Sequence, residues 1–370
     1  MYYFDHSSTT PIHPDVLKLI NEVQKSNYGN PSSIHKKGRI ARSLIEQSRE
    51  KIANAIGTEP NKIIFTSGGT ESNNQVLWSR LGKSKNHIIS DVIEHPAILN
   101  VLEFLKKYNI DFSLCPVNSK GVISIDRLKE EIKLKTGLIS IMLSNNEIGT
   151  IQPIQQIIET AQQKNILVHS DAVHSFGKMK LNVDKMGIDF LSLSAHKFYG
   201  PKGIGILYVK RKKNISPFLI GGGQERGLRA GTEDTASIAG MGLAAEIAEK
   251  NLDQNIEKLK KLETEFISKL KLIYPKAIFN GNKKNKLPGL VSVSFPGFRS
   301  DILLAKLDRV GIYVANGAAC GSGDVKPSMV LNAIDLTDEQ NISTIRFSFG
   351  SKNSKEDLQF LLLKLEEILI

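Results

Sequence analysis

Residues 192–205 read SLSAHKFYGPKGIG and place one lysine, Lys197, between two apolar segments. These segments, residues 190–193 and 204–209, have the length and composition of buried β-strands. A lysine flanked by small residues and buried strands is poorly placed for a solvated charge, although a strand-end lysine can still extend its amine to water. A desolvated lysine amine can form a Schiff base with an aldehyde. Lys197 is therefore a candidate for carrying pyridoxal phosphate, and the strand-end alternative stays open at this point.

Strand-like and helix-like segments alternate from residue 62 to residue 209. This alternation predicts an α/β fold with a mostly parallel sheet covered by helices. Functional groups of such sheets gather beyond the carboxyl ends of the strands, so we expect one cleft to receive four residues that follow strands: Thr70, Asn146, Asp171 and Lys197. The predicted strands are residues 62–66, 87–91, 110–117, 138–144, 166–170, 190–193 and 204–209. The predicted helices are residues 15–26, 34–56, 73–81, 97–108, 126–132, 154–164 and 235–273, the last being one kinked helix or two in sequence.

The pattern changes near residue 255, and a chain of 370 residues fits about two domains. A helical segment there is followed by strand-like residues 290–295 and 344–349, which predicts a smaller α+β unit. We therefore assign residues 15–254 to a large cofactor-binding domain, and residues 1–14 and 255–370 to a small domain.

The composition, with 41% hydrophobic and 24% charged residues, is ordinary for a soluble globular protein. No apolar run approaches the roughly 18 residues that span a membrane, and the chain does not start like a secretory signal, so we expect a cytoplasmic protein. The net charge of +11 lies largely on lysines of amphipathic helices, which favours a solvated surface over direct nucleic-acid binding. The two cysteines, Cys115 and Cys320, cannot form a disulfide framework or a cysteine-rich zinc site, and we predict no metal.

Residues 67–72 read SGGTES between a predicted strand and a helix. A glycine pair at this place frees backbone N–H groups to face an anion, and the helix dipole adds favourable potential. Thr70 supplies a hydroxyl, and the lysine of a nucleotide P-loop is missing. The turn therefore predicts a phosphate site, while a purely steric need for the two glycines remains the alternative.

Three charged or titratable residues also stand where a cofactor enzyme needs them. Asp171 ends an apolar strand, where a buried carboxylate needs a cationic partner such as a protonated pyridine nitrogen; the alternative is a helix or turn cap. His95 precedes a proline and a helix and can stack on an aromatic cofactor, or simply cap the helix. Arg346 starts the strand RFSFG and can grip a carboxylate, or form a surface ion pair.

Cys320 lies in residues 316–323, NGAACGSG, which are all small. A structural cysteine is normally surrounded by apolar bulk, so this thiol is expected to be accessible and suited to act as a nucleophile. Cys115, in the predicted strand 110–117, is expected to be inert core.

Taken together, these motifs resemble the cysteine desulfurases of the NifS/IscS type, in the class V aminotransferase family. The resemblance runs from residues 4–11 (FDHSSTTP) to residues 346–350 (RFSFG). The motifs between them are TSGGTESNN, SNNEIGTIQPI, SAHKFYGPKGIG, GGGQERGLRAGTED and NGAACGSG. The resemblance implies fold type I of the pyridoxal phosphate-dependent transferases.

The resemblance also implies roles for single residues. Lys197 matches the lysine that holds the cofactor, Asp171 the partner of the pyridine nitrogen, and His95 the catalytic histidine stacked on the ring. Asn146 and Arg346 match positions that orient the substrate. Four further matches are cofactor or phosphate contacts: Gly69, Thr70, Ser194 and His196.

Two other positions carry a qualification. Thr232, in RAGTED, matches a phosphate contact made from a neighbouring subunit, which implies a homodimer. His174 stands where the family usually has a glutamine that hydrogen-bonds the ring hydroxyl of the cofactor. A histidine can donate the same bond, but its charge can vary near neutral pH.

The implied reaction takes sulfur from L-cysteine, releases L-alanine and leaves a persulfide on Cys320. The sulfur would then pass to an acceptor protein, an iron–sulfur scaffold or a tRNA-thiolation enzyme. The alternatives are a selenocysteine lyase, another class V enzyme without need of Cys320, or a non-catalytic protein that kept the fold.

Overall fold

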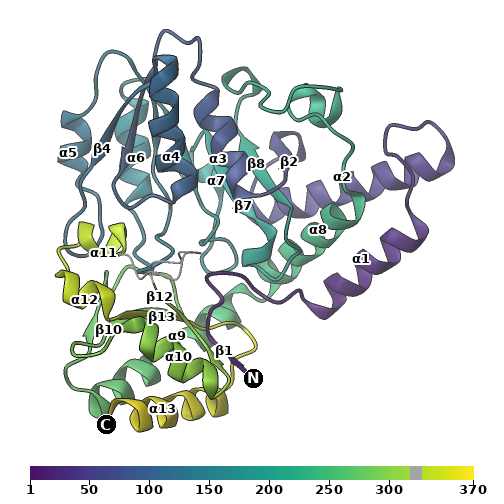
Figure 1. Ribbon diagram of the computed structural model, residues 1–370. Helices are drawn as coiled ribbons and strands as arrows, with labels where there is room; N and C mark the ends of the chain where they lie inside the picture. Colours follow the sequence, from purple (N-terminus) through teal and green to yellow (C-terminus); the bar gives the residue numbers. More distant parts are fainter. Residues whose placement is uncertain (317–326) are drawn as a thin grey trace.

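The computed structural model describes residues 1–316 and 327–370 (Figure 1). Among these residues, seven strands form a sheet in the order β2-β8-β7-β6-β5-β3-β4. The five strands from β7 to β4 pair in parallel, whereas β8 is antiparallel to both β7 and β2. The predicted α/β fold with a mostly parallel sheet is therefore confirmed. The strands are β2 (Ile63–Thr66), β3 (His87–Asp91), β4 (Asp111–Cys115), β5 (Thr136–Ser140), β6 (Leu167–Asp171), β7 (Phe190–Ser194) and β8 (Gly205–Val209).

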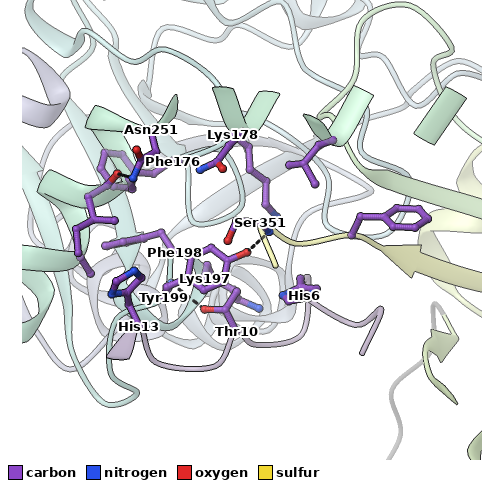
Figure 2. Close-up of a pocket in the computed structure, with 17 residues that line it drawn as sticks. His6, Thr10, His13, Phe176, Lys178, Lys197, Phe198, Tyr199, Asn251 and Ser351 are labelled. Atoms are coloured by element: carbon purple, nitrogen blue, oxygen red, sulfur yellow. Dashed lines mark hydrogen bonds between the residues drawn. The ribbon is translucent and has the colours of Figure 1, made fainter. Parts of the chain in front are cut away.

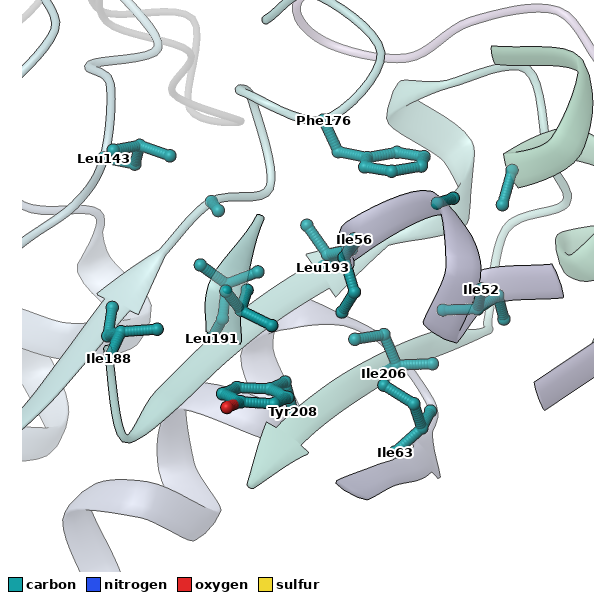
Figure 3. Packing of buried hydrophobic residues seen from close by; sticks show 14 of the residues in the cluster. Ile52, Ile56, Ile63, Leu143, Phe176, Ile188, Leu191, Leu193, Ile206 and Tyr208 are labelled. Atoms are coloured by element: carbon teal, nitrogen blue, oxygen red, sulfur yellow. The ribbon is translucent and has the colours of Figure 1, made fainter. Parts of the chain in front are cut away.

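Helices cover both faces of this sheet because side chains alternate along each strand. Leu191 and Leu193 face a core built with α1, α2, α6 and α8, whereas Phe190, the residue before Leu191, faces a second core under α3 and α4. Figure 3 shows Leu191 and Leu193 beside Ile56 of α2. The helices of this part are α1 (Pro14–Ser26), α2 (Lys36–Ile56), α3 (Gly69–Trp78), α4 (Pro96–Leu105), α5 (Ile125–Glu130), α6 (Ile154–Gln162), α7 (Val183–Met186) and α8 (Thr235–Lys250).

A smaller antiparallel sheet, β12-β13-β10-β9, has a separate aromatic-rich core. Phe4 from the start of the chain is buried in this core, and β1 pairs in parallel with β11. Both chain ends lie in this part (Figure 1), while the division at residues 14/15 and 254/255 remains a prediction. Its elements are β1 (Tyr2–Tyr3), α9 (Leu252–Ile273), β9 (Ile278–Phe279), β10 (Leu290–Ser294), α10 (Ser300–Arg309), β11 (Ile312–Tyr313), β12 (Ala315–Asn316), α11 (Met329–Ala333), α12 (Asp338–Ile342), β13 (Thr344–Ser348) and α13 (Lys355–Leu369).

Several predicted boundaries were wrong for local reasons. Helix α3 begins at Gly69, not at residue 73, so the predicted turn is the first turn of the helix. The strand predicted over residues 138–144 ends at Ser140, although the N–H groups of Ile141 and Leu143 beyond it still donate to carbonyl oxygens of β6. For residues 235–273, by contrast, the alternative of two helices in sequence is confirmed, and the two meet at Asn251. Helices α11 and α12 were not predicted, because five residues are too few to show a helical period.

Short 3₁₀ turns complete the described chain. They are Pro60–Lys62, Lys106–Tyr108, Ala195–Lys197, Lys212–Asn214 and Gln224–Gly227. No helix of residues 1–316 and 327–370 has both the length and the apolar composition to cross a membrane.

Truncating Leu191 tests the packing under the site. Leu191 is fully buried, so Leu191→Ala should lower the free energy of unfolding by about 2–5 kcal/mol through lost burial and a cavity. Urea denaturation measures this change. The matched control, Leu134→Ala, removes a side chain that is 99% exposed and should shift the midpoint little. Equal effects of the two substitutions would contradict this packing.

Candidate active site

A pocket of about 510 Å³ opens at the carboxyl ends of the parallel strands. It forms there because β5, β6 and β7 end at one edge of the sheet, and the segments that follow them turn toward the same space. Nine residues singled out from the sequence line it: Gly69, Thr70, His95, Asn146, Asp171, His174, Ser194, His196 and Lys197. The expected single cleft is therefore present.

Lys197 ends the 3₁₀ turn that directly follows β7. Its Nζ donates hydrogen bonds to the carbonyl oxygens of Ser7 at 2.6 Å and Ser8 at 2.8 Å. Burial, together with the nearby cations Lys178 and Arg346, lowers the pKa of Lys197 to about 7. Because the amine bonds to backbone carbonyls inside the protein, the alternative of a strand-end lysine reaching for water does not hold. A useful fraction of the amine is unprotonated at neutral pH and can act as a nucleophile or a base.

Lys178 lines a second, smaller pocket of about 100 Å³ together with Lys197 (Figure 2). Burial lowers the pKa of Lys178 to about 8, with a further contribution from Arg346. This lysine was not singled out from the sequence. It adds to the positive potential that favours loss of the Lys197 proton.

Asp171 is the last residue of β6 and is 8% exposed. Its Oδ2 accepts a hydrogen bond from Asn73 Nδ2 at 2.7 Å, and its Oδ1 accepts one from the backbone N–H of Val173 at 2.9 Å. The cap alternative is therefore partly right, but the carboxylate also lines the pocket. These two donors hold the Asp171 carboxylate in place at the pocket. A carboxylate held there could pair with a protonated ring nitrogen.

The first turn of α3 forms a cup on the same pocket. Gly68 is its N-cap, with φ 152°, in the region that favours glycine. A Cβ added to Gly69 would lie 2.6 Å from Val173 Cγ2, so the steric need for that glycine is real. The first helical turn still leaves N–H groups without intrahelical partners beside the Thr70 hydroxyl. The cup therefore suits a phosphate as well as close packing.

The three histidines of the pocket differ in their bonding. His95 caps α4, since its Nδ1 accepts from the N–H of Ala97 at 3.0 Å, and burial lowers its pKa. His196 contacts Thr9 Oγ1 at 3.2 Å, and burial lowers its pKa to about 4. The Nδ1 atom of His174 is buried without a partner among the described residues.

The expectation of a variable charge on His174 is corrected by its surroundings. Burial lowers the pKa of His174 well below its usual range, and Lys197 and Lys178 act in the same direction. The imidazole therefore stays neutral near pH 7. A neutral imidazole keeps one N–H donor, as the family glutamine does.

Arg346 lies within β13 rather than at its start, and only 6% of it is exposed. One terminal nitrogen donates to the carbonyl oxygen of Asn146 at 3.0 Å, and the other to Asp5 at 2.9 Å and to Ser8 Oγ at 2.7 Å. Its Nε is buried without a partner among the described residues. The surface ion pair proposed as an alternative is therefore wrong.

Two predicted residues of the described chain, Arg346 and Thr232, are not among those that line this pocket. Thr232 lines another hollow, of about 310 Å³, together with residues 27–31. Cys320 lies outside the described residues. Cys115 is fully buried in β4, and burial raises its thiol pKa to about 12, so its expected role as inert core is confirmed.

Ser7, Ser8 and Asn73 also contact the site residues but were not predicted from the sequence. The carbonyls of Ser7 and Ser8 contact a lysine 190 positions away, which no local pattern reveals. Asn73 lies one helical turn after Gly69, so its place on the pocket face of α3 was the available signal.

A mostly parallel sheet with a lysine turn after β7 and a carboxylate at the end of β6 defines a pyridoxal phosphate-dependent transferase of fold type I. The chain matches the family Aminotransferase class-V over residues 2–361. It belongs to that family, in the group of the NifS/IscS-type cysteine desulfurases, and the resemblance stated from its motifs is confirmed.

The similar proteins share nearly the full length of the chain. Cysteine desulfurase IscS of Dictyoglomus turgidum is 43% identical over 370 residues, covering 99% of this chain and 94% of the relative. A solved NifS-like protein superposes with a TM-score of 0.94 at 37% identity, covering 100% of this chain and 99% of the other. SspA, solved in complex with cysteine, has a TM-score of 0.82 at 36% identity, covering 94% of this chain and 99% of the other.

The acidity of Lys197 can be measured without any cofactor. In the apoprotein, reductive methylation of Lys197 should be half-maximal near pH 7, because the folded protein lowers its pKa from 10.5. Peptide mass spectrometry at a series of pH values reads the modification. In urea the same residue should shift toward 10.5. A midpoint that is equally alkaline in the folded and unfolded chains would contradict the described environment.

Proposed function

We propose that this chain is a cysteine desulfurase that uses pyridoxal 5′-phosphate to take sulfur from L-cysteine. The sulfur is received by Cys320 as a persulfide, and L-alanine is released. The observation that carries the proposal is the gathering, in one pocket, of the Lys197 amine with a pKa of about 7, the Asp171 carboxylate and the α3 cup. The named relatives, cysteine desulfurases over nearly their whole length, support the same activity.

The donor groups of the pocket fit this cofactor. Lys197 would hold its aldehyde carbon, Asp171 its ring nitrogen, and His95 the face of its ring. His174 would donate to its ring hydroxyl. Four residues that line the pocket would bind its phosphate: Gly69 and Thr70 of the cup, Ser194 and His196. When bound, the cofactor supplies an electron sink for the carbon that loses a proton.

Residues of the chain bind the substrate, accept its proton and receive its sulfur. Arg346 and Asn146 bind the substrate carboxylate, and the unpartnered Nε of Arg346 is a buried donor suited to it. The unprotonated Nζ of Lys197 accepts the α-proton. The Cys320 thiolate then forms an S–S bond to the substrate sulfur while the substrate Cβ–S bond breaks and leaves its electron pair on Cβ. Cβ takes up a proton equivalent to the one that the Cys320 thiol lost, and the α-carbon regains its own, which gives alanine.

We infer a cytoplasmic homodimer in which Thr232 of one copy reaches the phosphate of the other. The place of Thr232, away from the pocket of its own chain, supports this. The acceptor of the persulfide sulfur would be an iron–sulfur scaffold or a tRNA-thiolation enzyme, with no direct contact to nucleic acid or membrane.

Two substitutions separate cofactor attachment from sulfur transfer. Cys320→Ala should keep the yellow colour of the attached cofactor but lose alanine and persulfide formation, because only the sulfur acceptor is missing. Lys197→Ala should lose the colour and the turnover together. Absorbance and alanine release from cysteine measure both, with selenocysteine as a comparison substrate. Cys115→Ala is the matched control and should retain activity. Full sulfur transfer by Cys320→Ala would refute the proposal.

His174 should act as a neutral hydrogen-bond donor. His174→Gln keeps an N–H donor, so its turnover should stay within about 3-fold and its pH profile should keep the same shape between about pH 6 and pH 8. His174→Leu should lose about 10-fold or more, since the bond to the cofactor is gone. Disappearance of an ionisation from the profile of His174→Gln would show instead that this residue titrates.

A further inference from the structure

A carboxylate lies in the cup that is proposed to hold phosphate. Glu71, the third residue of α3, is 9% exposed and lines the pocket beside Gly69 and Thr70. Its Oε2 accepts the backbone N–H of Ser67 at 2.7 Å, which fixes the turn before the helix. An unopposed negative charge at this place would repel a phosphate dianion.

Arg229 opposes that charge. Its Nε donates to Glu71 Oε1 at 3.0 Å and its Nη2 to Glu71 Oε2 at 3.4 Å. Although burial raises the pKa of Glu71, the hydrogen bonds from Arg229 and Ser67 bring it below its usual range. Glu71 is therefore ionised at neutral pH, and Arg229 is the cation that it pairs with among the described residues.

The segment that carries Arg229 is held tightly to the sheet. Glu225 is 6% exposed and binds Arg49 through two hydrogen bonds of 2.8 Å, and it also accepts the N–H of Phe65 at 2.8 Å. Glu225 and Arg226 both have positive φ, 46° and 60°. Such backbone persists only where surrounding contacts impose it.

Helix α3 holds the same segment directly. Gln75, one turn after Glu71, donates through Nε2 to the carbonyl oxygen of Leu228 at 2.9 Å. Glu71 and Gln75 therefore grip consecutive residues, Leu228 and Arg229, from one face of the helix. These contacts hold the Arg229 guanidinium against Glu71 in the cup instead of in solvent.

We propose that Arg229 is a positioning residue of the phosphate cup, which cancels the charge of Glu71 so that a phosphate dianion can bind. Glu71 gives the cup its shape through Ser67, and Arg229 removes the repulsion that this carboxylate would otherwise cause. The inference rests on the proposed function, because it assumes that the cup takes the phosphate of the cofactor. Arg229 would raise the affinity of the protein for the cofactor without contacting the cofactor directly.

Binding of pyridoxamine 5′-phosphate to the apoprotein tests this without forming a bond to Lys197. Calorimetry should show that Arg229→Met weakens binding at least about 10-fold, since Glu71 is left unopposed. Glu71→Gln should bind at least as tightly as the unsubstituted protein, because its amide oxygen can still accept from Ser67. The double variant, Glu71→Gln with Arg229→Met, should recover to within about 3-fold. Pyridoxamine, which lacks the phosphate, should bind all four proteins alike.

Arg226→Met is the matched control. It removes an arginine from the same segment whose guanidinium donates to the carbonyl oxygen of Asn61 instead, so phosphate affinity should not change. A double variant that binds as weakly as Arg229→Met would overturn the inference, since the pair would then be structural only. If Arg229→Met does not fold, weaker binding by Glu71→Gln alone would overturn it equally. An unsubstituted protein that does not bind pyridoxamine 5′-phosphate would instead remove the proposed cofactor, and this inference with it.

Discussion

The parallel pairing of β6 with β7 is the constraint on which the site depends. Asp171, the last residue of β6, pairs with Ser192, so β7 extends two residues further and ends at Ser194. The 3₁₀ turn that carries Lys197 follows directly. Adjacent strands lie about 4.8 Å apart, which brings the carboxylate and the amine to the same pocket. A slip of one residue would turn Asp171 to the opposite face of the sheet. The cores on both faces fix the register, because the successive residues Phe190 and Leu191 of β7 belong to different hydrophobic clusters.

The electrostatics of the pocket come from distant parts of the chain. Lys178 follows β6, and Arg346 belongs to the small antiparallel sheet, yet both lower the pKa of Lys197. Arg346 also ties the loop at Asn146 to the first residues of the chain through Asp5 and Ser8. The smaller part of the molecule therefore helps to set the chemistry of a lysine held by the larger sheet. Glu71 of the same pocket is likewise paired with a cation, Arg229.

Much of this could be predicted from the sequence, and the failures have physical causes. The alternation of strand-like and helix-like segments predicted the sheet, because hydrophobic periodicity reveals the elements. The residues that follow the strands predicted the pocket lining, because parallel strands end at the same edge of the sheet. The antiparallel place of β8 could not be foreseen, since direction in a sheet depends on long-range pairing. The carbonyl partners of Lys197 and the pairing of Arg229 with Glu71 were missed for the same reason. The start of α3 was misplaced because glycines normally argue against a helix, whereas here Gly68 is its cap.

We propose Lys197 as the residue that carries the cofactor. Borohydride reduction of the holoenzyme, followed by peptide mass spectrometry, tests it most directly, because reduction makes the attachment permanent. A pyridoxyl adduct is expected on Lys197 alone. An adduct on Lys178 or Lys202, both of which border the pockets around Lys197, would contradict it.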